Sequence, residues 1–351
     1  MQESAITLSV STAFNNGTFA GLTQPDLVLV SSDETLFYVH GTILSGTSFY
    51  TALTNLHSEP PADSTPIVTP YACPLPEDNN KIWVKVKDII ADELNIVLHA
   101  LYNTSCAKHQ PKFDTVARAI DKMASLFGLV VKAVIRLGNE FYNYILTITP
   151  LHPLRVYALA AHHRIHSLAV KASAHLLSYP IGAISDEESE RMGAIYLRKL
   201  FLLQMERKER LIGLLFSPLR PHASVPGCGP HEQKTLKGLW TGALANLIYD
   251  LRAGEFLSSS YCITQIWAEA CQIVLTCYSS SLDVSSTVLQ RALEPLKTQI
   301  PCSQCVDTLQ TKVNEIIGTW VSIRVCLSDF GCSAIDVLTQ ALLAHYLMAG
   351  P

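Results

Sequence analysis

The chain has 351 residues, enough for two domains, and 48% of them are hydrophobic, enough to build sizeable cores. Only 16% are charged, against roughly 25% in an average soluble domain, which favours a subunit of an oligomer or complex over a solitary enzyme. The net charge is −4, so there is no basic excess to neutralise phosphates and nucleic acid is not expected as a direct partner.

The N-terminal sequence does not have the pattern of a secretory signal, because residues 1–14 contain no Lys or Arg and include Glu3. No run of 18 apolar residues occurs, since Lys132 and Glu269 interrupt the most apolar stretches. We therefore expect an intracellular protein, cytoplasmic or nuclear, with no membrane partner. The ten cysteines are then expected as reduced thiols, packing residues or metal ligands rather than as disulfides.

The N-terminal part of the chain combines short strands with helices. Residues 1–24 are rich in Ser, Thr, Asn and Gly, and we predict a disordered lead-in there. The apolar run 26–30 and the β-prone run 35–39 flank a polar turn, which is the pattern of a β-hairpin. Residues 40–56 then become helical, and residues 66–69 form a further short strand between two Pro-rich turns.

Helical stripes account for most of the remaining chain. Apolar residues recur with the 3.6-residue period of an α-helix, and Pro or Gly separates the stretches. One predicted helix follows the Pro-rich turn at residues 74–77 and runs to about Asn103. The others cover residues 114–137, 140–149, 154–176, 186–215, 240–251, 262–277, 306–325 and 335–347.

Two charged clusters and one Pro-rich stretch lie within this helical part. The acidic cluster 186–190 is interpreted as a helix start, with Ser185 as the N-cap, rather than as paired catalytic carboxylates. The charge run 206–210 is interpreted as a solvated helix face. Residues 217–230 include four prolines and predict a linker.

Several strings of the N-terminal half resemble BTB/POZ domains. Residues 26–45 are similar to the family's opening hairpin and helix, with His40 at the strand-to-helix corner, where its ring can bond nearby backbone. Residues 94–102 and 116–128 resemble two helices that follow in the family. Strings typical of a fungal branch of the family lie at residues 152–160, 191–197, 221–228 and 300–305.

The resemblance implies a fold class and a domain organisation. It implies an α/β BTB/POZ-like domain, a small sheet covered by helices, over residues 25–145, followed by an all-helical region. This region comprises a helical extension over residues 146–216, a Pro-rich linker over 217–232 and a C-terminal helical region over 233–351.

The resemblance also implies a function. BTB/POZ modules form homodimers and bind other proteins, and some bring substrates to cullin-type ubiquitin ligases. We therefore expect a non-enzymatic protein-interaction protein, a homodimer that serves as an adaptor. Two alternatives belong to other classes: a transcription-associated regulator, for which we find no DNA-binding finger or basic stretch, and a metal-dependent enzyme that uses the His and Cys residues. No G-x-S-x-G elbow, P-loop or G-x-G-x-x-G string supports an enzyme.

The Cys and His residues of the C-terminal half predict a metal site. Cys302 and Cys305 form a C-x-x-C pair just before a helix, where two thiolates can bind one metal. The linker contributes His222 and Cys228, with His231 as the substitute if His222 points away. Three Cys and one His form a recurrent structural zinc set, so these four residues are expected to hold one structural zinc ion. The alternative is that they are ordinary reduced cysteines.

A second histidine cluster lies on the predicted helix 154–176. His162 and His166 are spaced i, i+4 and can in principle share a metal, with His163 between them. No carboxylate stands nearby in sequence, so we interpret the cluster as a polar flank of the helix.

Overall fold

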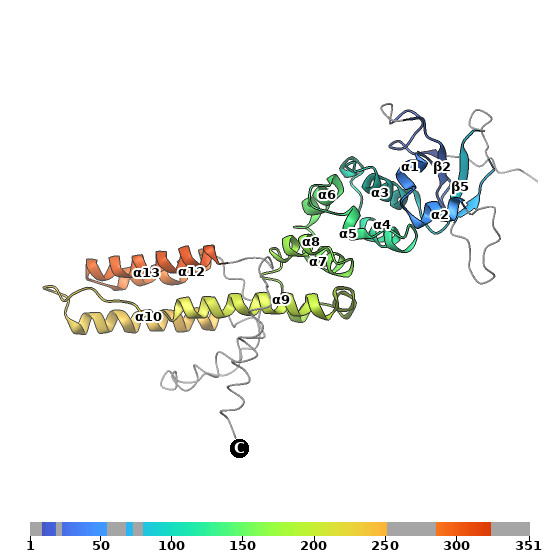
Figure 1. Ribbon diagram of the computed structural model, residues 1–351. Coiled ribbons are helices and arrows are strands. Elements are labelled where there is room, and N and C mark those ends of the chain that lie inside the picture. The colour runs from blue at the N-terminus through green and yellow to red at the C-terminus, as the bar shows by residue number, and fades with distance from the viewer. Residues whose placement is uncertain (1–8, 19–22, 55–67, 73–79, 251–285, 324–351) are drawn as a thin grey trace, which may run out of the picture. The chain divides into compact units, whose positions relative to one another are not determined.

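The structure, a computed structural model, describes residues 9–18, 23–54, 68–72, 80–250 and 286–323 (Figure 1). The chain divides into two compact units, residues 1–169 and residues 170–351. The described part of the first unit contains a small mixed sheet with helices, and the described part of the second unit is helical.

The described strands of the first unit form one five-stranded sheet, in the order β1-β3-β2-β5-β4. The strands are β1 (Ser9–Val10), β2 (Leu27–Val30), β3 (Thr35–Val39), β4 (Val68–Pro70) and β5 (Ile82–Val86). β2 pairs antiparallel with β3 and parallel with β5. The hairpin predicted for residues 26–39 is therefore present, and β5 joins it through a crossover connection.

The β2–β3 hairpin is apolar on both faces, because successive side chains of a strand point to opposite sides. Four cross-strand pairs fill these faces, each residue 5% exposed or less: Leu27 with Val39, Val28 with Tyr38, Leu29 with Phe37 and Val30 with Leu36. Val28, Val30, Leu36 and Tyr38 form one core cluster with Trp83 of β5.

His40 fixes the corner between β3 and helix α1 (Gly41–Leu44). Its Nε2 lies 2.6 Å from the carbonyl oxygen of Thr23, and its Nδ1 lies 2.8 Å from the hydroxyl of Tyr102. The next amide, that of Gly41, donates to Asp26 Oδ1 at 2.7 Å. The ring thus bonds nearby backbone, as the sequence predicts for a residue at this corner.

The remaining helices of the first unit begin and end near the predicted positions in most cases. They are α2 (Ser48–Thr54), α3 (Ala91–Leu101), α4 (Phe113–Ser125), α5 (Val131–Val134), α6 (Glu140–Ile148) and α7 (Pro153–His162). Helix α8 (His166–Ser173) continues across the boundary between the units. Gly128 separates α4 from α5 with φ +59°, and a Cβ there would lie 2.0 Å from Ser48 Oγ.

Three features of this unit differ from the sequence predictions. Residues 9–18, expected as part of a disordered lead-in, include β1, and Phe14 is fully buried against the ring of His99. β5 replaces the first part of the helix predicted before Asn103. The single helix predicted over residues 154–176 is broken between α7 and α8, because Arg164 has a left-handed backbone, φ 56°.

The second unit packs its helices around one hydrophobic core. The helices are α9 (Asp186–Leu215), α10 (Pro230–Asp250), α12 (Ser286–Leu293) and α13 (Ser303–Ser322). Leu211, Trp240, Leu289 and Trp320 are among the buried core residues, so each of the four helices contributes. The predicted helices 262–277 and 335–347 lie outside the described residues.

Helix α9 begins as the sequence predicts. The Ser185 side chain accepts a hydrogen bond from the Glu188 amide, and the Glu188 carboxylate accepts one from the Ser185 amide, which is a capping box. The kink inside α9 falls at Gly193, whose φ of 71° is unstrained only for glycine.

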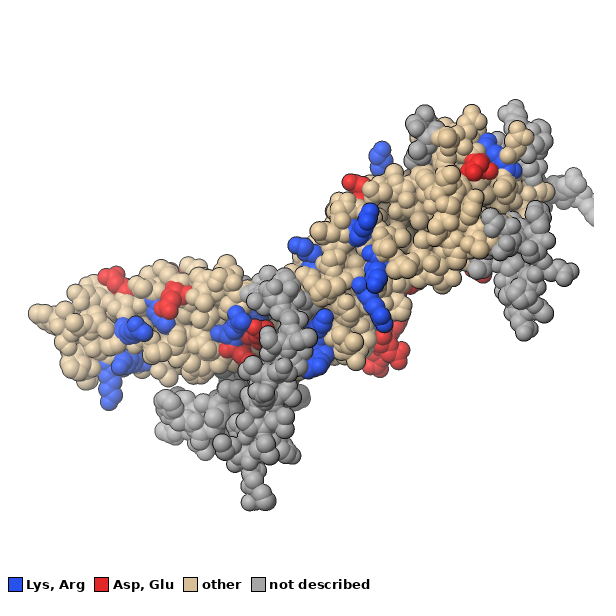
Figure 2. Space-filling view, viewed as in Figure 1, with Lys and Arg blue, Asp and Glu red and all other residues tan. Residues whose placement is uncertain are grey.

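Charged side chains are few on the face shown in Figure 2, where Lys, Arg, Asp and Glu are scattered over a surface of other residues. The charge run 206–210 is not wholly solvated as expected, since Lys208 is 8% exposed and Arg207 stacks on the ring of Trp320. Among the described helices, none is both long enough and apolar enough to cross a bilayer.

Candidate metal centre

The segment between α9 and α10 presents two of the four predicted ligands. Val225 and Cys228 exchange both backbone hydrogen bonds, at 3.2 and 2.9 Å, around the central residues Pro226 and Gly227. Gly227 has φ +85°, and Pro followed by Gly is the pair favoured at the centre of a type II turn. The tight turn places the Cys228 thiol, 1% exposed, against the core of the second unit.

The first turn of α13 presents the other two ligands. Cys302 is the N-cap residue of the helix, and Cys305 lies in its first turn. The C-x-x-C spacing brings both thiols to the same end of the helix, because residues three apart lie on one helix face. Cys305 is 1% exposed, while Cys302 is half-buried.

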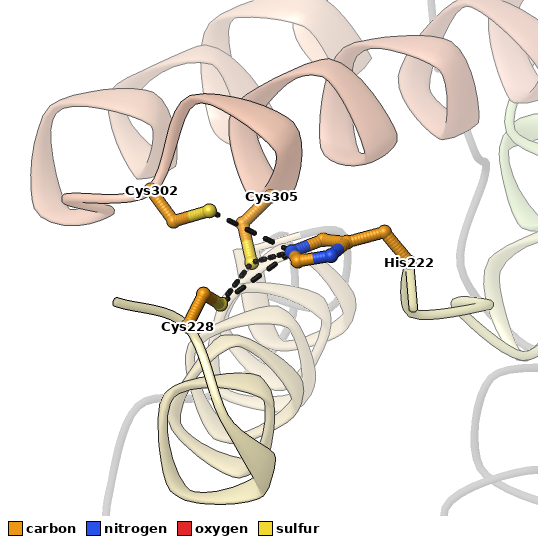
Figure 3. Close-up of side chains that lie close together, drawn as sticks. All are labelled: His222, Cys228, Cys302 and Cys305. Carbon is orange, nitrogen blue, oxygen red and sulfur yellow. Dashed lines mark hydrogen bonds between the residues drawn. The ribbon is translucent and has the colours of Figure 1, made fainter. Parts of the chain in front are cut away.

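The four side chains converge around one point, as Figure 3 shows. His222 Nε2 lies 3.2 Å from Cys305 Sγ, 3.4 Å from Cys228 Sγ and 3.6 Å from Cys302 Sγ. The sulfurs of Cys228 and Cys305 are 3.5 Å apart. All four ligand atoms lie within 4.8 Å of one another, so the group can hold a metal ion.

These distances are close to those of a tetrahedral zinc site. With Zn–S bonds of about 2.3 Å and a Zn–N bond of about 2.0–2.1 Å, two sulfurs lie about 3.8 Å apart and a nitrogen and a sulfur about 3.6 Å apart. The four separations given above, 3.2 to 3.6 Å, differ from these values by a few tenths of an ångström. Small rotations of the His222, Cys228 and Cys305 side chains are enough to place their ligand atoms around one ion.

The ring of His222 is held in the orientation that a metal ligand needs. Its Nδ1 lies 2.6 Å from the carbonyl oxygen of Ala223, and a carbonyl accepts hydrogen bonds only, so Nδ1 carries a proton. Nε2 of the neutral ring then offers its lone pair to the cluster. The Gln233 side chain donates to the His222 carbonyl at 2.8 Å and fixes the backbone of this residue from α10.

The thiols of the cluster have opposite tendencies to ionise. Hydrogen bonds lower the pKa of Cys302 to about 7: chiefly that of the Cys305 amide, and then those of the Cys228 side chain, the Gln304 amide and the His222 side chain. Burial, with the neighbouring thiols, raises the pKa of Cys305 to about 12, and burial also raises the pKa of Cys228. A divalent cation between them favours the thiolate form of every ligand.

The structure thus brings together the four residues singled out in the sequence. His231, the substitute ligand, is exposed on α10 and is not part of the cluster. Four protein ligands around one ion would fill a tetrahedral coordination shell, as in structural zinc sites, whereas a catalytic zinc keeps one position for water or substrate.

The second histidine cluster is arranged differently from its sequence pattern. His162 and His166 do not lie on one continuous helix, because α7 ends at His162 and α8 begins at His166. His163 instead contacts Asp121 of α4, with His163 Nε2 2.8 Å from Asp121 Oδ1. Sequence reasoning missed this carboxylate because it lies 42 residues away along the chain.

Comparisons of the chain with models of protein families, with curated protein sequences and with solved structures give no match.

Proposed function

We propose that this chain is a non-enzymatic protein-interaction protein whose helical unit is held together by one structural zinc ion. The observation that carries the proposal is the group formed by His222, Cys228, Cys302 and Cys305, with all ligand atoms within 4.8 Å of one another. Soft thiolates and an imidazole favour zinc over magnesium or calcium, which prefer oxygen ligands. Four protein ligands leave no position for a substrate, so the ion serves the fold.

The zinc ion joins parts of the chain that lie far apart in sequence and that already meet in the hydrophobic core of the unit. Cys228 and Cys305 are separated by 77 residues, and the segment around His222 and Cys228 is irregular apart from one turn. Metal binding fixes this segment to α13, and the free energy of metal binding then adds to the folding free energy of the unit.

The N-terminal unit supplies the interaction function in this proposal. Support comes from the β2–β3 hairpin that leads into α1 at His40, which is the arrangement that the BTB/POZ resemblance implies. The low charged fraction, 16%, favours surfaces that lie against a partner. We propose that the chain forms a homodimer through this unit and binds other proteins as an adaptor.

Metal analysis of the purified full-length protein tests the structural zinc. Inductively coupled plasma mass spectrometry is expected to find one zinc ion per chain, and the Cys305→Ser variant is expected to lose it. Cys106→Ser is the matched control, because Cys106 is also a buried free cysteine but lies in the first unit. A wild-type protein without stoichiometric metal, after purification without chelators and after addition of zinc, overturns the proposal.

Light scattering tests the self-association. A homodimer is expected to give twice the 38.5 kDa mass of one chain, and to do so in the Cys305→Ser variant as well, provided that this variant stays folded. A monomer at micromolar concentration contradicts the proposed dimer but has no bearing on the zinc site, so the two parts of the proposal are tested independently.

A further inference from the structure

A second group of potential metal ligands lies in the first unit, at the point where α4 meets the end of α7. Asp121 comes from α4, and His162 and His163 are the last residue and the C-cap of α7. One carboxylate oxygen and one nitrogen of each ring lie within 4.8 Å of one another. We propose that these three side chains form a binding site for a divalent transition-metal ion, independent of the Cys and His centre.

The backbone positions the two histidines at this point. The amide of His163 donates to the Leu159 carbonyl at 3.1 Å, and Arg164 then adopts a left-handed conformation, φ 56°, that ends the helix. The rings of His162 and His163 are nearly perpendicular, with centroids 4.8 Å apart. Two adjacent residues therefore direct their rings to the same end of α7, next to the carboxylate of Asp121.

His163 and Asp121 require only a small adjustment to share one ion. His163 Nε2 and Asp121 Oδ1 are 2.8 Å apart, and nitrogen and oxygen ligands of a tetrahedral zinc lie about 3.3 Å apart. His163 is nearly buried, its side chain 7% exposed, whereas that of Asp121 is 39% exposed. His162 is exposed and is free to turn its ring toward the pair.

The surroundings suit a cation. The C-terminal end of a helix carries a partial negative charge, which attracts cations within its last turn. Two imidazoles and one carboxylate are ligands typical of zinc and of other first-row divalent ions. Three protein ligands leave at least one coordination position open, and two of the three residues reach solvent, so water or a carboxylate of a partner can complete the coordination.

Metal titration of the full-length protein tests this site. Apo protein titrated with Co²⁺ is expected to bind two equivalents. The first produces thiolate-to-cobalt charge-transfer bands, and the second produces only the weaker d–d bands of nitrogen and oxygen ligands. His162→Ala and Asp121→Asn are each expected to weaken the second equivalent at least tenfold and to leave the charge-transfer bands unchanged.

His175→Ala is the control, because His175 is an exposed histidine that belongs to neither cluster. Cys305→Ser is expected to remove the charge-transfer bands and keep the second equivalent, so that this site and the proposed zinc centre are measured separately. Circular dichroism checks the fold of each variant, and His162→Ala removes only an exposed side chain. A protein that binds no second equivalent, or variants that bind it unchanged, overturn the site; Asp121 and His163 then form a hydrogen-bonded pair only.

Discussion

The guanidinium carbon of Arg207 lies 4.0 Å from the centroid of the Trp320 ring, so the side chain of α9 stacks on α13. Burial lowers the pKa of Arg207, and its Nη1 has no hydrogen-bond partner within the described residues. The indole ring therefore supplies the favourable interaction that a carboxylate would supply elsewhere.

Truncation of Arg207 is expected to destabilise the helical unit. Arg207→Ala removes the cation–π contact and the packing of the aliphatic stem, and we expect a loss of about 1–2 kcal/mol in the free energy of unfolding. Urea denaturation followed by circular dichroism measures it. The control Arg210→Ala removes an exposed i, i+4 pair with Glu206 and is expected to cost about 0.5 kcal/mol or less. Equal losses in the two variants contradict the role of the Trp320 contact.

Glu93 is a buried carboxylate between α3 and α4, 2% exposed. It accepts from Arg118 Nε at 2.6 Å and from Lys122 Nζ at 2.5 Å. Although burial opposes it, these two cations hold the pKa of Glu93 below its usual value.

Glu93→Ala is expected to destabilise the protein by about 2 kcal/mol, because it removes two charge-assisted hydrogen bonds, while the side chains of Arg118 and Lys122, 53% and 26% exposed, remain hydrated. Thermal or urea unfolding measures the change. Asp92→Ala is the matched control, since Asp92 is exposed on the same turn of α3. If Asp92→Ala lowers the free energy of unfolding as much as Glu93→Ala does, the proposed role of the Glu93 ion pairs is contradicted.

The buried side chain of His99 is expected to make the stability of the protein depend on pH. Burial, with a smaller effect of His109, lowers the pKa of His99 to about 4. Its Nδ1 bonds Thr104 Oγ1 at 2.7 Å, and its Nε2 has no partner within the described residues. The folded protein thus keeps His99 neutral, whereas the unfolded chain takes up a proton below about pH 6.5. Its contribution to stability is complete above that pH and is lost as the pH falls toward 4.

Between about pH 7.5 and about pH 5, the wild type is expected to lose about 2 kcal/mol more stability than the His99→Leu variant. Urea midpoints across this range provide the comparison. His175→Leu should keep the wild-type slope, because His175 is exposed. Parallel pH profiles for the wild type and His99→Leu would refute the prediction.

Bound metal is expected to protect the three cysteines of the proposed centre from thiol labelling and to have no effect on Cys106. In zinc-loaded protein, Cys228, Cys302 and Cys305 should resist maleimide, and a chelator should make them reactive. Cys106 should stay unreactive in both states, because it is fully buried and burial raises its pKa to about 12. Peptide mapping by mass spectrometry measures the extent of labelling at each cysteine. Labelling of the three cysteines that a chelator does not change would count against a metal there.

The β-hairpin and the metal cluster are the parts that could be predicted best from the sequence. The hairpin could be predicted because two apolar runs flank a short polar turn, a local signal. The cluster could be predicted because Cys302 and Cys305 have the spacing of a metal-binding pair, and because the linker supplies a histidine and a further cysteine that complete a recurrent zinc-ligand set. No local pattern indicates that Cys228 and Cys305 lie close together in space, because 77 residues separate them along the chain.

The features that the sequence analysis missed depend on tertiary contacts. β5 has four apolar residues and Lys85, without a regular alternation, and follows a Pro-rich stretch. Its strand conformation is fixed by pairing with β2 and β4. The break before α8 falls at Arg164, a residue that favours helices by itself. Asp121 approaches His163 only once α4 and α7 are in place.

The order in which the chain is made constrains when the Cys and His centre can form. Cys228 leaves the ribosome 77 residues before Cys305, and α10 and α12 lie between them in sequence. A metal shared by all four ligands can therefore be bound only after Cys305 has emerged. Until then, His222 and Cys228 form at most half of the proposed site on the nascent chain.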